Sequence, residues 1–216
     1  AHNLAIGRDA LNVVNSGGEY NVAIGNYALS SLTSSDANVA VGYEAGKAIT
    51  GGGDGVVVIG YQAGVALTDC SSSVFIGYQA GDGHDDEDHN IGIGRHALGG
   101  SIAGAEYNVA IGSYTLDALT SGDSNTAVGY NSGSSISTSN QNTLLGESAG
   151  ANIATGDGRN TVIGYNCFNV SGGLLQTGNN NIALGERCKT NGVAATFQYV
   201  IGSNVEAIIH RVKISE

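Results

Sequence analysis

Residues 21–28 read Asn21-Val22-Ala23-Ile24-Gly25-Asn26-Tyr27-Ala28, and this pattern returns along the whole chain. It consists of an asparagine, three apolar residues, an anchor glycine and, three positions later, a small residue. The anchor glycine occurs twelve times, at Gly7, Gly25, Gly42, Gly60, Gly77, Gly94, Gly112, Gly129, Gly146, Gly164, Gly185 and Gly202. Neighbouring copies are 17 or 18 residues apart, except for the 21 residues from Gly164 to Gly185. So short and constant a period is typical of stacked repeats, in which each unit contacts its neighbours.

The length of the unit predicts the fold. A unit of 17 or 18 residues is too short for a pair of helices, but at about 3.3 Å per residue it accommodates two short strands and two turns. We therefore predict an all-β protein: a parallel β-solenoid (β-roll) of about twelve 17–18-residue coils. The anchor glycine is expected where a side chain would obstruct a turn or where φ is positive. The asparagine is expected to adopt the left-handed conformation and to bond its own backbone.

The apolar triplet before each glycine bears on assembly. In Val22-Ala23-Ile24 and Val74-Phe75-Ile76, for example, all three residues are apolar. Because side chains alternate between the two faces of a strand, an unbroken apolar run predicts burial on both faces. The inner face fills the coil, so the outer face needs a partner. Since the middle residue is usually small, as at Ala23 and Ala110, we predict close approach to identical neighbours about a symmetry axis, most simply in a homotrimer.

Composition indicates one elongated, acidic, folded domain. The 216 residues include 35 glycines and no proline, methionine or tryptophan, and 41% are hydrophobic, more than a disordered tract would contain. A formal charge of −11 argues against partners such as nucleic acid or anionic membranes, and no apolar run approaches the ~20 residues of a membrane span. We expect the solenoid at residues 1–205, and at 206–216 a closing strand or the lead into a further C-terminal domain. The missing methionine, even at position 1, predicts a piece of a longer protein.

Three cysteines do not make a disulfide framework. Cys167 and Cys188 fall three residues after successive anchor glycines, in the small column expected to face the interior. They could be bridged on oxidation, but the sequence favours free thiols that fill alanine positions. Cys70 lies in a Thr-Asp-Cys-Ser-Ser segment.

The repeats resemble those of known fibres. Asn21-Val22-Ala23-Ile24-Gly25, Asn125-Thr126-Ala127-Val128-Gly129-Tyr130 and Val58-Ile59-Gly60-Tyr61-Gln62-Ala63-Gly64 are similar to the N-T-A-I-G-Y-x-A repeats of phage tail-fibre and bacterial surface-fibre proteins. They also resemble the YadA-like head of trimeric autotransporter adhesins, although the coils here are longer than those of that head. The resemblance covers residues 3 to about 205. It implies a trimeric, left-handed parallel β-roll.

The segment Asp82–His89 is the sharpest local anomaly. It places five acidic residues and two histidines within eight positions. Clustered carboxylates are ligands that calcium prefers, although the spacing does not match an EF-hand loop. The sequence leaves open a calcium site and a solvated surface loop, and favours the loop.

Tyrosine follows the anchor glycine in five copies, and three of these are consecutive: Tyr43, Tyr61 and Tyr78. Their spacing predicts a ladder of rings on neighbouring coils. Such a ladder could contact sugar rings of a receptor, or it could pack ring on ring between coils, which is the more common arrangement.

Two other classes of solenoid fit poorly. Hexapeptide acyltransferases need an aliphatic residue every six positions, whereas Ile111 is followed by Asp117 and Asp123. The scattered histidines (His2, His84, His89, His96 and His210) do not pair with a nucleophile at a recognisable spacing. An ice-binding face would need a long rank of threonines, and Thr126, Thr143 and Thr161 provide one for three coils only.

The sequence therefore predicts a non-enzymatic, homotrimeric fibre segment on a virion (a phage tail fibre) or another extracellular surface, an adhesin-like protein that mediates cell adhesion. Its outer loops or tip would bind a cell-surface glycan or protein receptor, without membrane insertion and without a cofactor unless calcium occupies the Asp82–His89 loop. The alternative is a passive shaft that spaces a binding tip outside this chain.

Overall fold

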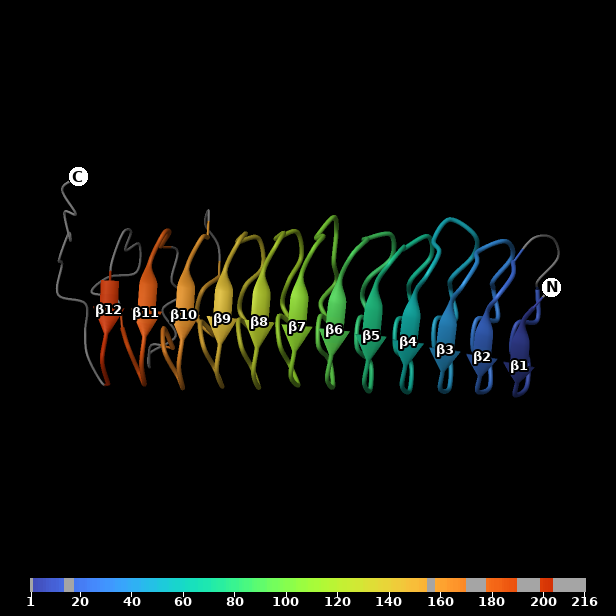
Figure 1. Ribbon diagram of the computed structural model, residues 1–216, viewed down its shortest axis with the longest axis horizontal. Helices are drawn as coiled ribbons and strands as arrows, with labels where there is room; N and C mark the ends of the chain where they lie inside the picture. The colour runs from blue at the N-terminus through green and yellow to red at the C-terminus, as the bar shows by residue number, and fades with distance from the viewer. Residues whose placement is uncertain (1, 14–17, 155–157, 170–177, 190–198, 204–216) are drawn as a thin grey trace.

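A computed structural model of the protein describes residues 2–13, 18–154, 158–169, 178–189 and 199–203. Twelve three-residue strands lie side by side in one parallel sheet, in chain order, and form an elongated solenoid (Figure 1). The strands are β1 (Leu4–Ile6), β2 (Val22–Ile24), β3 (Val39–Val41), β4 (Val57–Ile59), β5 (Val74–Ile76), β6 (Ile91–Ile93), β7 (Val109–Ile111), β8 (Thr126–Val128), β9 (Thr143–Leu145), β10 (Thr161–Ile163), β11 (Ile182–Leu184) and β12 (Tyr199–Ile201). The predicted all-β parallel solenoid is confirmed.

Each predicted repeat supplies one strand, which ends just before its anchor glycine. Neighbouring strands pair residue for residue, as where Ala40 lies opposite Val58. Backbone hydrogen bonds continue past the strand, since Gly42 N donates to Ile24 O at 2.7 Å. Like positions of successive repeats therefore stack in columns, and we call the stretch from one strand to the next a coil and name it by its strand.

The prediction of two strands per coil is wrong for the described residues. The remainder of each coil is turns and irregular backbone, apart from isolated bridges. Left-handed residues recur in it: around β3, φ is 57° at Ala37, 54° at Glu44 and 57° at Gly46. A left-handed residue reverses the local direction of the chain, so the segments between such residues are too short for a second strand.

The anchor glycines are required for both predicted reasons. Gly42 has a φ of 140°, a conformation that L-residues rarely adopt. A Cβ on Gly42 would also lie 2.2 Å from the carbonyl oxygen of Gly60 in the next coil. The glycine column is therefore the place where the backbones of successive coils approach most closely.

The asparagine column does something other than what the sequence predicted. The left-handed residue is the one before the asparagine, for example Tyr107 (φ 59°) before Asn108. The buried side chain of Asn108 bonds between coils, since its Oδ1 accepts from both Asn125 N (2.9 Å) and Asn125 Nδ2 (3.1 Å). The prediction of a local bond was wrong because a copy of the same residue lies one coil away and offers better-placed donors.

The interior is filled by columns whose side chains compensate for one another in size. The small column three residues after the anchor glycine is buried as predicted, from Ala28 to Cys188. Where the middle strand residue is small, a large side chain follows in the same coil, as with Ala23 and Leu29. Where it is large, as at Phe75, the matching position is Gly81, whose Cβ would lie 2.3 Å from the Phe75 ring. Cys70, Cys167 and Cys188 are buried free thiols.

The middle strand residue faces this interior and not a neighbouring chain. From β2 to β12 the middle residue is buried, while the first and third residues are partly or largely exposed. The prediction that small middle residues mark close approach between chains is therefore wrong, because their size is set by packing inside the coil. The outer face is formed by the branched residues on either side.

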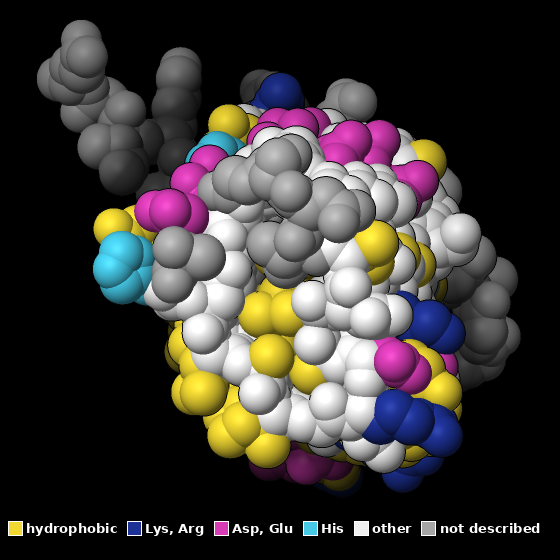
Figure 2. Space-filling view, turned by 90° about the vertical axis from the view of Figure 1, so that its right-hand side faces the viewer, with side chains coloured by type: hydrophobic (Ala, Val, Ile, Leu, Met, Phe, Trp, Pro, Cys, Tyr) yellow, Lys and Arg dark blue, Asp and Glu magenta, His cyan; other side chains and the backbone are white. Residues whose placement is uncertain are grey.

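That outer face is apolar along most of the rod. Its exposed members include Ile6, Ile111, Leu145, Ile163 and Ile201. Figure 2, seen from the β1 end, shows hydrophobic side chains gathered at the lower left and acidic ones along the top. Within the described part of the chain, no helix has the length and apolar character needed to cross a membrane. The predicted 206–216 segment lies outside the described residues.

Candidate functional site

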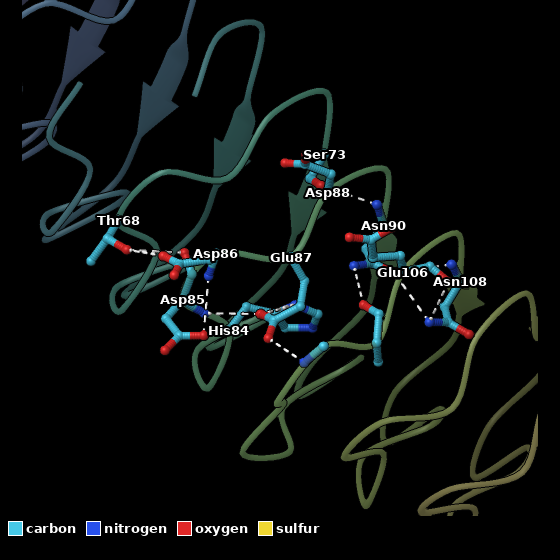
Figure 3. A network of polar contacts seen from close by, with 12 residues as sticks. Thr68, Ser73, His84, Asp85, Asp86, Glu87, Asp88, Asn90, Glu106 and Asn108 are labelled. Atoms are coloured by element: carbon cyan, nitrogen blue, oxygen red, sulfur yellow. Dashed lines mark hydrogen bonds and ion pairs between the residues drawn. The ribbon is translucent and has the colours of Figure 1, made fainter. Parts of the chain in front are cut away.

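The acidic segment Asp82–His89 completes the β5 coil, and most of its carboxylates bind backbone groups (Figure 3). Asp88 Oδ1 accepts a hydrogen bond from Ser71 N, and Glu87 Oε1 accepts one from Gly104 N at 2.8 Å. Asp86 accepts from the hydroxyl of Thr68 in the preceding coil. These carboxylates tie the β5 coil to the coils on both sides.

Asp88 belongs to a column of polar residues that the sequence reading missed. Six residues before the anchor glycine, a side-chain oxygen accepts from the backbone N–H of the like position one coil away. Asp36 N donates to Asp54 Oδ1 at 2.7 Å, and Glu106 N donates to Asp123 Oδ1 at 2.9 Å. The column could have been found by aligning the repeats on this position, where acids recur.

His84 and Glu87 are buried although they belong to a segment predicted to be a surface loop. His84 occupies a column in which other coils carry Leu32, Ile49 and Leu67, and it packs on Phe75 with ring centroids 4.8 Å apart. Its Nδ1 lies 3.7 Å from Glu87 Oε2, and neither ring nitrogen has a hydrogen-bond partner. Burial lowers the pKa of His84 to about 3, so the imidazole is neutral at physiological pH.

The predicted calcium site gains no geometric support from this arrangement. In the described ranges, no group of three or more His, Cys, Asp or Glu side chains is placed to hold a metal ion. The acids of the segment point in several directions, with Asp85 and Asp86 exposed and Glu87 buried. Their hydrogen bonds give them a structural role.

The three predicted receptor-contacting tyrosines do form a ladder. The centroids of Tyr43 and Tyr61 are 5.3 Å apart at an interplanar angle of 14°, and those of Tyr61 and Tyr78 are 5.2 Å apart at 8°. Each ring is about two-fifths exposed. Because the rings stack face to face, each covers the face of its neighbour, and mainly edges and hydroxyls reach solvent. Stacking of a sugar ring needs a free aromatic face, so this geometry favours packing between coils.

A polar ladder runs beside the tyrosines. Gln79 Nε2 donates to Gln62 Oε1 at 3.0 Å, Gln62 Nε2 donates to Glu44 Oε2 at 2.8 Å, and Lys47 Nζ donates to Glu44 Oε1 at 2.8 Å. The bond from Lys47 lowers the pKa of Glu44. The surface next to the rings is thus held in one arrangement by side-chain amides.

The aromatic row continues beyond the predicted residues. The ring of His96 meets Tyr78 edge-on at 5.6 Å and stacks on Tyr114 at 5.4 Å. The guanidinium of Arg95 lies 5.5 Å from the Tyr78 ring and 5.6 Å from the Tyr114 ring. Sequence reasoning missed His96, Arg95 and Tyr114 because they occupy two different positions of the repeat and become neighbours only when the coils stack.

Comparison with known proteins finds no matching family model, no similar curated protein and no similar solved structure.

Proposed function

We propose that the chain is a segment of a non-enzymatic, homotrimeric fibre, with left-handed coils, that is exposed on a virion or another extracellular surface and serves attachment to a cell-surface receptor. The observation that carries the proposal is the apolar outer face of the sheet. It is formed by two branched residues per strand over most of the rod, for example Val57 and Ile59 on β4. An exposed face of this length is typical of a surface that is covered in the assembled protein.

Identical copies of the chain are the simplest cover. The outer face repeats with the spacing of the coils, and a second copy carries a face of the same period. Charge supports association through this face and not through the acidic columns, because each chain has a net charge of −11 and like-charged surfaces repel. The resemblance of the repeats to trimeric fibre heads favours three copies. On a rigid rod, three receptor sites would bind with avidity.

The mass in solution tests the assembly. Light scattering coupled to size exclusion should give about 65 kDa for three chains of 21.7 kDa, and about 43 kDa would indicate a dimer. Ile59→Lys, which places a charge on the outer face, should release monomers. Gln62→Lys, with the same charge change beside the tyrosines, should leave the mass unaltered. A wild-type chain that stays monomeric at all concentrations would refute the trimer.

A passive shaft is the second candidate, and the face-to-face packing of Tyr43, Tyr61 and Tyr78 favours it. A glycan array and a cell-binding assay separate the two functions. Attachment predicts binding that is lost when the trimer dissociates, whereas a shaft should bind neither glycans nor cells.

A further inference from the structure

A small pocket interrupts the surface between the β6 and β7 coils. Five residues after the anchor glycine, three successive coils carry Asp82, Gly99 and Asp117. Because Gly99 has no side chain, a cavity of about 180 Å³ remains there, lined by His96, Gly99, Tyr114 and Asp117. We call it the Gly99 pocket.

Both aspartates of this column have an oxygen without a protein partner. Oδ1 of Asp82 and Oδ1 of Asp117 are each inaccessible and accept no hydrogen bond. Asp82 reaches toward Gly99, since its Oδ1 lies 3.1 Å from where a Cβ on Gly99 would be. Burial raises the pKa of both carboxyl groups, while the nearby His96 acts in the opposite sense on both. An unpaired buried acceptor is costly, so a donor at this place would be bound favourably.

These aspartates differ from the structural acids of the rod. Asp54, Asp88 and Asp123 each accept a backbone N–H from a neighbouring coil, whereas Oδ1 of Asp82 and of Asp117 accepts none. Their column carries unlike residues in other coils, for example Lys47 and Ser134. The fold therefore does not require aspartate at these positions.

The walls of the pocket determine what kind of donor fits. His96 and Tyr114 form an aromatic side, and Arg95 already lies over the Tyr78 and Tyr114 rings. Two carboxylates are thus set near one guanidinium and one imidazole, which leaves little net charge to attract a cation. The volume equals about six water molecules and is smaller than the roughly 300–1,000 Å³ of sites for drug-sized ligands. A small neutral ligand with several hydroxyl groups matches these properties.

We propose that the Gly99 pocket binds a single sugar ring, whose hydroxyl groups donate to Asp117 and Asp82 and whose body lies beside His96 and Tyr114. The imidazole, which can donate or accept, would complete the hydrogen bonds of the hydroxyl groups. All the residues of the pocket belong to one chain, so the site does not depend on the trimer. As part of an attachment fibre, it would be the place where a glycan receptor is bound.

The test uses the full chain and a panel of free monosaccharides, with binding followed by saturation-transfer NMR and calorimetry. Asp117→Ala should weaken binding about tenfold or more, since it removes an acceptor of ligand hydroxyls. Gly99→Val should abolish binding by filling the cavity. Asp9→Ala, which removes an exposed carboxylate near the other end of the rod, should leave the affinity unchanged. Circular dichroism of each variant checks that the solenoid is intact.

The proposal is overturned if the wild-type chain binds no monosaccharide of the panel, or if Asp117→Ala and Gly99→Val both bind as wild type does. Binding of calcium or tetramethylammonium in place of sugars, seen as shifts of the His96 resonances, would also overturn it. The mass measurement stands apart from these results. A trimer that binds no sugar refutes the pocket alone, and a monomer that binds sugar refutes the fibre assembly alone.

Discussion

Replacing His84 by leucine should remove a large part of the acid sensitivity of the fold. The native imidazole is fully buried with two unpartnered nitrogens, and its pKa is about 3 against an ordinary value of 6.5. The charged groups that face it are Glu87, 3.7 Å from Nδ1, and Asp85, while Phe75 packs on the ring. The native protein therefore binds fewer protons than the unfolded chain between pH 6.5 and pH 3, and stability falls as the pH is lowered through that range.

The size of the effect follows from the two pKa values. At pH 5, which is 1.5 units below the ordinary value and still above the native one, protonation of the unfolded chain lowers the free energy of unfolding by about 2 kcal/mol. At pH 7.5 the same effect is close to zero. His84→Leu should also be more stable than wild type at pH 7.5 by about 1–3 kcal/mol, because it removes two buried unpaired polar atoms.

Urea unfolding at fixed protein concentration, followed by far-ultraviolet circular dichroism at pH 7.5 and pH 5.0, measures both quantities. The loss of stability between the two pH values should be about 2 kcal/mol smaller in His84→Leu than in wild type. His89→Asn, which removes an exposed histidine from the same segment, is the matched control and should behave like wild type. If His84→Leu loses as much stability on acidification as wild type does, the assignment of a neutral buried imidazole is refuted.

Three further changes test the columns. Gly60→Ala should cost more than about 3 kcal/mol in thermal unfolding, because its Cβ would lie 2.2 Å from Gly77 O, whereas Gly55→Ala, with nothing within 4 Å and a φ of 71°, should cost about 1 kcal/mol; equal losses would contradict the close approach of the coils. Asn108→Ala should cost about 2–3 kcal/mol in urea unfolding by leaving the buried N–H of Asn125 unpaired, and Asn26→Ala at an exposed position should cost under about 1 kcal/mol. Burial raises the pKa of the Cys70 thiol to about 12, so at pH 8 iodoacetamide should modify Cys70 only after unfolding; rapid labelling of the native protein, seen by peptide mass spectrometry, would show that the thiol is accessible.

Much of the fold could be predicted because its requirements recur at fixed positions. The anchor glycine meets a steric limit that is the same in each coil, and the alanine column fills the same space each time. The tyrosine ladder followed from the same period, since residues 17 or 18 apart come to lie one above another. The second strand per coil was predicted wrongly because most of the left-handed positions, such as Glu44 and Tyr107, are occupied by residues that do not favour that conformation.

The candidate site was less accessible to sequence reasoning. Asp82 belonged to a conspicuous acidic segment, but Gly99 and Asp117 appeared unremarkable, and His96 was one of several scattered histidines. Their joint property is a missing side chain flanked by two unpaired carboxylate oxygens, which exists only across three stacked coils. His84 was hidden for the same reason, since it is found to be buried only when its place in the leucine column is known.

The sequence by itself determined that this protein is a parallel solenoid, where each strand ends, and which residues stack, because a local steric requirement repeated twelve times leaves a visible period. Only the tertiary structure decided that the middle strand residues face inward, that Asn108 bonds to Asn125 in the next coil, and that Gly99 opens a pocket between two aspartates. The physical reason is that each of these properties depends on what lies one coil above or below, and the pattern of a single repeat contains no record of its neighbours.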